Sequence, residues 1–167
     1  MPKAGFFIRS LAFFLDLILV IILGTALGIL LGNDLAEFYF RGFLEPEVGL
    51  EPFDNIGQLF GSLAGIMIIS VVLMVIEGVF GRSFGKWMLK LKTVGLNDSI
   101  TRLMARALLK YVIAITSLIA GLTGILEIAS VGQILGIVVF IGGFLSLSGK
   151  RLNLLDIITK SSVLRKV

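Results

Sequence analysis

The 167-residue sequence contains neither cysteine nor histidine. Without cysteine it forms no disulfide, thiolate metal site or cysteine nucleophile, and without histidine it lacks an imidazole base, a common zinc ligand and a histidine pH switch. We find no nucleophile–base pair and no cluster of metal ligands in the sequence, so we expect no enzyme activity, no metal and no cofactor. Any proton chemistry is left to carboxylates, lysine or tyrosine.

Apolar residues are abundant and gather in four long runs. They make up 57% of the chain and the mean hydropathy is +1.05, well beyond an ordinary soluble domain. The first two runs are long enough to cross ~30 Å of hydrocarbon, which takes about 20 residues. We predict that the two shorter runs form a tight helical hairpin; the alternative is one span plus a re-entrant piece, with two spans in all as the fallback. The predicted spans cover residues 11–31, 59–80, 111–126 and 131–147. Residues 1–167 are therefore predicted to form one all-α transmembrane domain.

The charges are divided unevenly between the connecting segments. Of the fifteen lysines and arginines, only Arg41 falls in the acidic segment 32–57, whereas the rest lie in segment 81–110 or near the two chain ends. This is the positive-inside pattern, so we expect an inner (cell) membrane protein with both termini and the basic loop in the cytoplasm. Anionic lipid headgroups are the expected partner of these cations. No nucleic-acid motif accompanies them, so nucleic acid is not expected.

Glycines recur at every fourth position in the first two predicted spans. Small residues at this spacing let transmembrane helices approach closely. Two interpretations stay open: packing of the two helices within the chain, or a seam for a dimer or a path between helices. The glycines concerned are Gly24, Gly28 and Gly32 in the first span, and Gly57, Gly61 and Gly65 in or next to the second.

Two carboxylates, Asp16 and Glu77, fall inside the predicted spans at comparable depth below the cytoplasmic side. Arg9 precedes Asp16 by seven residues, which places both on one helix face about 10 Å apart along the axis. Carboxylates at that depth are costly unless they are paired or hydrated. Arg9, Arg82 and Lys86 are the candidate partners. The pair is either a site that exchanges protons or cations, or a structural cluster that sets helix register.

The segment after the second span predicts a small cytoplasmic region. Gly81 and Gly85 are expected to allow a sharp turn out of the membrane. Residues 89–94 alternate between apolar and polar side chains, which is typical of a strand, and residues 161–166 are a candidate partner strand. Residues 99–110 predict a basic amphipathic helix lying on the headgroups.

Four ordered elements resemble the RDD family of membrane proteins. Arg9 to Asp16 (RSLAFFLD) is similar to its opening R…D element, and Glu77 to Lys86 (EGVFGRSFGK) followed by KLKTVG is similar to its central segment. Arg106 to Lys110 and the KRLNLLD stretch ending at Asp156 complete the resemblance, which covers essentially the whole chain. Two departures are visible, since lysine and serine at 160–161 replace a usual Gly-Thr and serine at 83 replaces a usual threonine.

The resemblance implies that Arg9, Asp16 and Asp156 are the signature trio of the family. Glu77, Gly81, Gly85 and Lys86 accompany them. Some members are associated with sodium–proton exchange, and others resemble accessory components of membrane assemblies. We expect Arg9, Asp16, Glu77, Lys86 and Asp156 to form one ion-pair cluster at the cytoplasmic membrane edge.

Three functional hypotheses follow. The first is an accessory or scaffold component that binds a membrane-protein partner or a second copy through its glycine faces and basic loop. The second is a small sodium/proton antiporter that works as a dimer, with Asp16 and Glu77 as the exchanging carboxylates. The third, a lipid-binding protein at the inner leaflet, rests on basic residues that any positive-inside loop carries. We rank the scaffold slightly above the antiporter.

Overall fold

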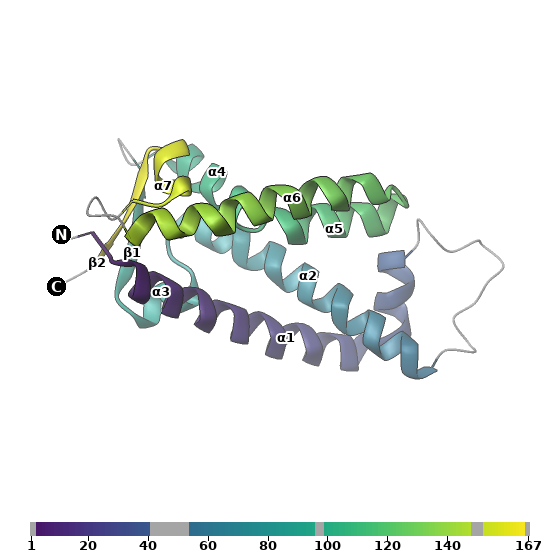
Figure 1. Cartoon of the computed structure of the whole chain (residues 1–167). Coiled ribbons are helices and arrows are strands. Elements are labelled where there is room, and N and C mark those ends of the chain that lie inside the picture. Colours follow the sequence, from purple (N-terminus) through teal and green to yellow (C-terminus); the bar gives the residue numbers. More distant parts are fainter. Residues whose placement is uncertain (1–2, 41–53, 96–98, 148–151, 166–167) are drawn as a thin grey trace. The chain divides into compact units, whose positions relative to one another are not determined.

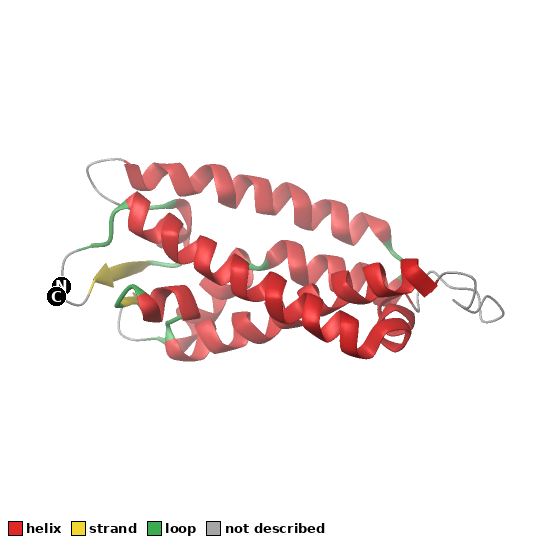
Figure 2. Ribbon diagram, turned by 90° about the horizontal axis from the view of Figure 1, so that it is seen from below, coloured by secondary structure: helices red, strands yellow, loops and turns green. Residues whose placement is uncertain are grey.

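The computed structural model describes residues 3–40, 54–95, 99–147 and 152–165, without the side chains of residues 33, 36–40 and 54–58. These residues form long helices, three shorter ones and one small antiparallel sheet (Figures 1 and 2). The chain divides into two compact units. Unit 1 comprises Met1–Ile18, Val72–Val112 and Ile134–Val167, and unit 2 comprises Leu19–Val71 and Ile113–Gln133.

The long helices confirm a multi-pass membrane protein. Among the described residues, three helical segments are long and apolar enough to cross a membrane, namely Phe6–Gly32, Leu59–Phe80 and Leu126–Leu147. Helices α4 and α5 together add a fourth if they form one span, although they are bent by 69° at their junction. The helices are α1 (Phe6–Phe40), α2 (Asp54–Phe80), α3 (Phe84–Met88), α4 (Ile100–Lys110), α5 (Val112–Thr123), α6 (Leu126–Gly143), the 3-10 helix η3 (Phe144–Leu147) and α7 (Leu154–Ile158).

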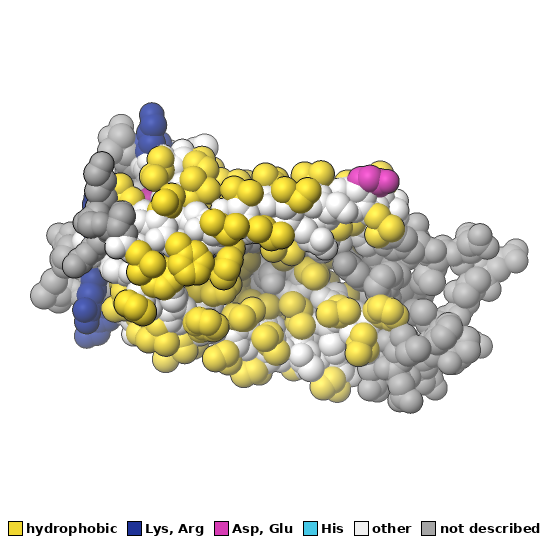
Figure 3. All heavy atoms as spheres, viewed as in Figure 1, with side chains coloured by type: hydrophobic (Ala, Val, Ile, Leu, Met, Phe, Trp, Pro, Cys, Tyr) yellow, Lys and Arg dark blue, Asp and Glu magenta, His cyan; other side chains and the backbone are white. Residues whose placement is uncertain are grey.

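Large apolar side chains lie on the outside of these helices (Figure 3). Ile22 and Leu30 of α1 are 60% and 79% exposed, and Phe140 of α6 is 66% exposed. A soluble monomer rarely leaves so continuous an apolar surface in water, whereas a helix in hydrocarbon presents apolar groups outward. A lipid environment therefore explains both the exposed apolar side chains and the high mean hydropathy.

The connection between α5 and α6 differs from the prediction. The turn was expected at residues 127–130, but α5 ends at Thr123 and α6 already begins at Leu126. Gly124 adopts φ +75, a left-handed conformation that glycine takes without steric cost, so the chain reverses there. Glu127 then lies in the first turn of α6, where the helix dipole favours a negative charge.

In unit 2, α1 and α2 approach each other at glycines. A Cβ atom at Gly24 would lie 2.5 Å from Ile66 Cα, and one at Gly28 would overlap the backbone at Ser62. A Cβ at Gly65 would in turn overlap the Gly24 carbonyl oxygen. At these three positions any larger residue would force the two helices apart.

The remaining glycines of the predicted repeat behave differently. A Cβ at Gly61 would lie 2.5 Å from the Gly32 carbonyl oxygen, but one at Gly32 would meet nothing within 4 Å. Gly32 instead has φ +44 and marks a kink inside α1. The surroundings of Gly57 lie outside the described residues.

In unit 1, strand β1 (Leu91–Gly95) pairs antiparallel with β2 (Ser161–Arg165). This confirms the predicted strand pair, with the first strand beginning two residues later than expected. The N-terminal segment extends the sheet, because the Ala4 N–H donates to the Val163 carbonyl at 2.9 Å. The first and last described segments of the chain therefore lie beside each other in this unit (Figure 1). The small core under the sheet consists of Ala4, Ala12, Leu91 and Val163.

The same short motif occurs twice in unit 1. Helix α3 leads through Lys90 (φ 54) into β1, and α7 leads through Lys160 (φ 47) into β2. Each copy thus joins a five-residue helix to a five-residue strand through a left-handed residue, and the pairing register is symmetric about Thr93 opposite Val163. Lys160 has a left-handed backbone conformation, which glycine adopts without steric cost. This explains why glycine is the usual residue here in the family that the sequence resembles.

Candidate functional site

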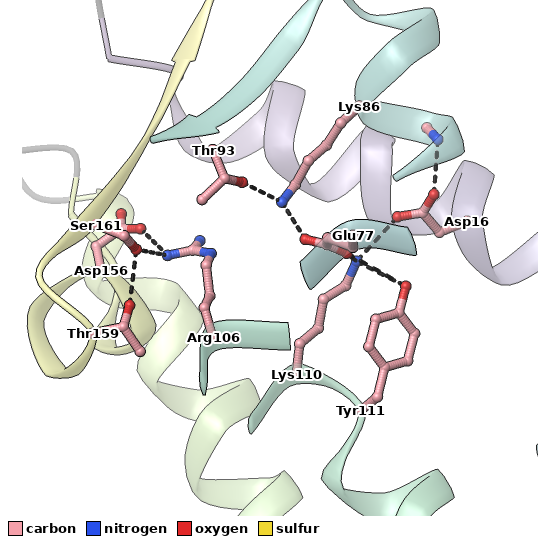
Figure 4. Close-up of polar contacts among 11 residues, drawn as sticks. Asp16, Glu77, Lys86, Thr93, Arg106, Lys110, Tyr111, Asp156, Thr159 and Ser161 are labelled. Atoms are coloured by element: carbon pink, nitrogen blue, oxygen red, sulfur yellow. Dashed lines mark hydrogen bonds and ion pairs between the residues drawn. The ribbon is translucent and has the colours of Figure 1, made fainter. Parts of the chain in front are cut away.

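Unit 1 contains two groups of buried, hydrogen-bonded polar side chains (Figure 4). We call them the Asp156 cluster and the Glu77 cluster. The Asp156 cluster comprises Arg9, Arg106, Asp156 and Ser161, and the Glu77 cluster comprises Asp16, Glu77, Lys86, Thr93, Lys110 and Tyr111.

The Asp156 carboxylate lies between two arginines. It is placed by α7, because a capping box joins the Asn153 side chain to the Asp156 N–H at 2.7 Å and the Asp156 carboxylate to the Asn153 N–H at 3.1 Å. Arg9 donates to one carboxylate oxygen at 2.5 Å and Arg106 donates to the other. Arg106 also donates to Ser161 Oγ at 2.8 Å. The Asp156 side chain is fully buried, so these contacts replace its hydration.

In the Glu77 cluster, two lysines approach the carboxylate of Glu77 near the end of α2. Lys86 donates to one carboxylate oxygen, and Lys110 donates to the other at 2.6 Å. Lys110 also reaches Asp16 at 3.1 Å, so one ammonium group bridges the carboxylates of α1 and α2. The second oxygen of Asp16 accepts the backbone N–H of Gly85 at 2.7 Å. The cluster thereby ties α1, α2, α3 and α4 to one another.

Lys86 occupies the third position of α3 and is almost completely buried. Besides Glu77 its ammonium group donates to Thr93 Oγ1 of β1 at 2.7 Å. Burial lowers the pKa of Lys86 to about 8, although the neighbouring Glu77 carboxylate acts in the opposite direction. Lys86 therefore links α3 to α2 and to the sheet through an ammonium group in a poorly solvated position.

The two clusters together hold three carboxylates and four cations. The Glu77 cluster has two carboxylates and two lysines, and the Asp156 cluster has one carboxylate and two arginines. Each of the three carboxylates is thus in contact with at least one cation. Within the described part of the chain, no group of three or more acidic side chains is placed to hold a metal ion.

The two glycines predicted to form turns have different environments. Gly81 adopts φ +66 directly after α2 and its carbonyl accepts the Thr93 N–H at 2.8 Å, so it does turn the chain. Gly85 lies inside α3, not in a turn. Its lack of a side chain allows α3 to touch α1, because a Cβ there would overlap the Ala12 carbonyl oxygen.

The five charged residues predicted for the ion-pair cluster all lie in unit 1, but in two clusters instead of one. Lys86 contacts Glu77 as expected, whereas Arg9 contacts Asp156 and not its neighbour in sequence Asp16. Arg9 also donates through Nε to the Ala4 carbonyl at 2.9 Å, which directs the side chain toward the start of the chain. Arg82, the third candidate partner, forms none of the ion pairs seen among the described residues, and its Nε is buried there without an acceptor.

Several cluster members were not identified as site residues from the sequence. The sequence predicts that Arg106 and Lys110 lie on a helix at the lipid headgroups. In the structure both side chains point into the clusters and are mostly buried. Their spacing of four residues places them on one face of α4, which was the available signal. Thr93, Tyr111 and Ser161 carry no charge, and nothing in their spacing indicated a buried polar contact.

A comparison with protein-family models matches residues 3–160 to the RDD family. The matched region includes both clusters except Ser161. No curated protein and no solved structure matches the chain.

Proposed function

Because this chain belongs to the RDD family of membrane proteins, we propose that it is a non-catalytic accessory or scaffold component of an assembly in the cell membrane. The observation that carries this proposal is the pairing of every carboxylate in the two clusters with buried cations. Such a closed set of ion pairs holds helices in register, and separating any pair leaves a buried charge uncompensated.

Four spans with both termini in the cytoplasm fit this proposal. The contact of Ala4 with Val163 supports an even number of spans, because such a number leaves both ends of the chain on the same side of the membrane. The bent pair α4 and α5 together serves as the third span in this arrangement. The remaining basic side chains then face anionic headgroups of the inner leaflet.

The glycines of α1 and α2 act in packing within the chain under this proposal. Gly24, Gly28 and Gly65 are each in contact with the opposite helix of the same chain, so they leave no open seam for a partner. Partner proteins therefore bind through other surfaces.

The antiporter hypothesis finds no comparable support. Exchange requires a carboxylate that alternates between a proton and a metal cation, but Asp16 and Glu77 share Lys110 and have further donors in Gly85 and Lys86. A transported cation would have to displace these donors. The buried lysines thus occupy the positions that a sodium ion would need.

Two experiments test the proposal together. Tagged protein extracted from native membranes in mild detergent should retain one or more other membrane proteins in fixed stoichiometry through two purification steps. In proteoliposomes of the purified chain, a sodium gradient should produce no pH change, and Asp16→Asn should be indistinguishable from wild type. A sodium-driven pH change that Asp16→Asn abolishes, with no retained partner, would replace the scaffold by the antiporter.

A further inference from the structure

Helix α6 carries an exposed amide in the middle part of a candidate span. Gln133 lies seven residues after the start of the span Leu126–Leu147, which is about 10 Å along the helix axis. The hydrocarbon is about 30 Å thick, so the amide is well below the headgroups. The side chain is nevertheless exposed on the surface of the protein.

This amide has no hydrogen-bond partner within the part of the chain that the structure describes. Ser130 lies one turn earlier and is also exposed. Its hydroxyl donates to the Leu126 carbonyl of the same helix at 3.3 Å, so its hydrogen-bonding need is met within α6. An amide facing hydrocarbon has no water to bond, and an unpaired polar group there is unfavourable. Gln133 is therefore an exposed polar group within the span of α6 for which the described residues supply no partner.

The neighbouring face of α6 is already in use. Gly132 faces α5, where a Cβ would overlap the Thr116 side chain. In an 18-residue apolar window of the span Leu126–Leu147 only 17% of the residues are buried, compared with 33% in such a window of Leu59–Phe80. The described residues thus leave the face that carries Gln133 open.

We propose that this face of α6 binds the same face of a second copy of the chain, with the two Gln133 amides hydrogen-bonded to each other. A glutamine amide has both donors and an acceptor, so it complements an identical group. In a dimer with a two-fold axis along the membrane normal, one position of α6 meets its own copy at the axis. Polar side chains that bond across helices in this way hold transmembrane helices together. This interface is independent of the ion-pair clusters and of the scaffold proposal.

The natural lack of cysteine allows a direct test. Gln133→Cys introduces a single cysteine, and Ile22→Cys is the matched control because Ile22 is an exposed apolar position in the span of α1. In native membranes, mild oxidation should convert Gln133→Cys to a disulfide-linked dimer of the chain and leave Ile22→Cys monomeric. Equal cross-linking of the two variants, or cross-linking of position 133 to a different protein only, would overturn the proposal.

A second variant tests the amide without a cross-link. Gln133→Leu keeps the side chain compatible with lipid but removes the hydrogen bonds, so dimerisation of fluorophore-labelled protein in liposomes should weaken by about 3- to 30-fold. A matched Ile22→Leu variant should dimerise like the wild type. Unchanged dimerisation of Gln133→Leu, a monomeric wild type, or rapid labelling of Gln133→Cys by a water-soluble maleimide would each refute the interface.

Discussion

Replacing Asp156 by asparagine removes one negative charge from a fully buried position while keeping the size of the side chain. Arg9 and Arg106, of which only 10% and 5% is exposed, then lose their common counter-ion. Removing one partner of a buried ion pair costs about 3–5 kcal/mol. The substitution removes two ion pairs, but the asparagine amide oxygen can still accept from one arginine and from the Asn153 N–H. We therefore expect the free energy of unfolding to fall by an amount within this range. For a chain of this length the thermal midpoint should fall by about 6–20 °C.

The single tryptophan provides the assay. Trp87 lies in α3 of unit 1, so its fluorescence in detergent or nanodiscs reports unfolding of the unit that contains the cluster. The matched control is Asp34→Asn, the same substitution at an exposed position of α1, which should change the midpoint by no more than about 2 °C. In the double variant Asp156→Asn with Arg106→Gln, the losses should not add, because the second change removes a charge that the first left unpaired. Equal midpoints for Asp156→Asn and Asp34→Asn would refute the structural role of the cluster.

Three further predictions concern the same unit. The stability of the protein should rise between pH 8 and about 10.5, because burial lowers the pKa of Lys86 to about 8 and the unfolded chain, with its ordinary pKa of 10.5, binds more protons in this window. Lys86→Met should remove this rise, whereas Lys92→Met, at an exposed position of β1, should keep it. The same pH profile in both variants would show that Lys86 does not cause the rise. Gly85→Ala should lower stability by about 1–3 kcal/mol because its Cβ collides with the backbone of α1, whereas Gly5→Ala, with nothing within 4 Å, should be neutral in the same thermal assay. Lys160→Gly should raise stability by up to about 1 kcal/mol, because glycine removes the steric cost of the left-handed conformation at φ 47 and this gain exceeds the entropy that glycine adds to the unfolded chain. A lower thermal midpoint for Lys160→Gly would contradict this prediction.

Much of the membrane architecture could be predicted from local patterns. Long apolar runs located the helices α1, α2 and α6, and alternation in residues 89–94 located β1 within two residues. The turn between α5 and α6 is not at residues 127–130 as the apolar pattern predicts, although Glu127 and Ser130 interrupt that pattern. Gly124 turns the chain instead. Ser130 is accommodated inside α6 because its hydroxyl bonds to the Leu126 carbonyl of the same helix, and Glu127 lies in the first turn of that helix.

The sequence by itself determined that the chain lies in a membrane, roughly where its helices run, and that Asp16 and Glu77 fall within its apolar spans. Hydropathy and charge are properties of single residues and short segments, so no tertiary information is needed to detect them. Only the tertiary structure decided the pairing: Arg9 meets Asp156 across 147 positions, and Lys110 meets Asp16 across 94. Apolar helices of similar composition can pack in many arrangements, and a long cationic side chain can reach several carboxylates. The choice among them depends on close contacts such as Gly85 against Ala12, which set the distances between the helices and are not encoded in any local pattern.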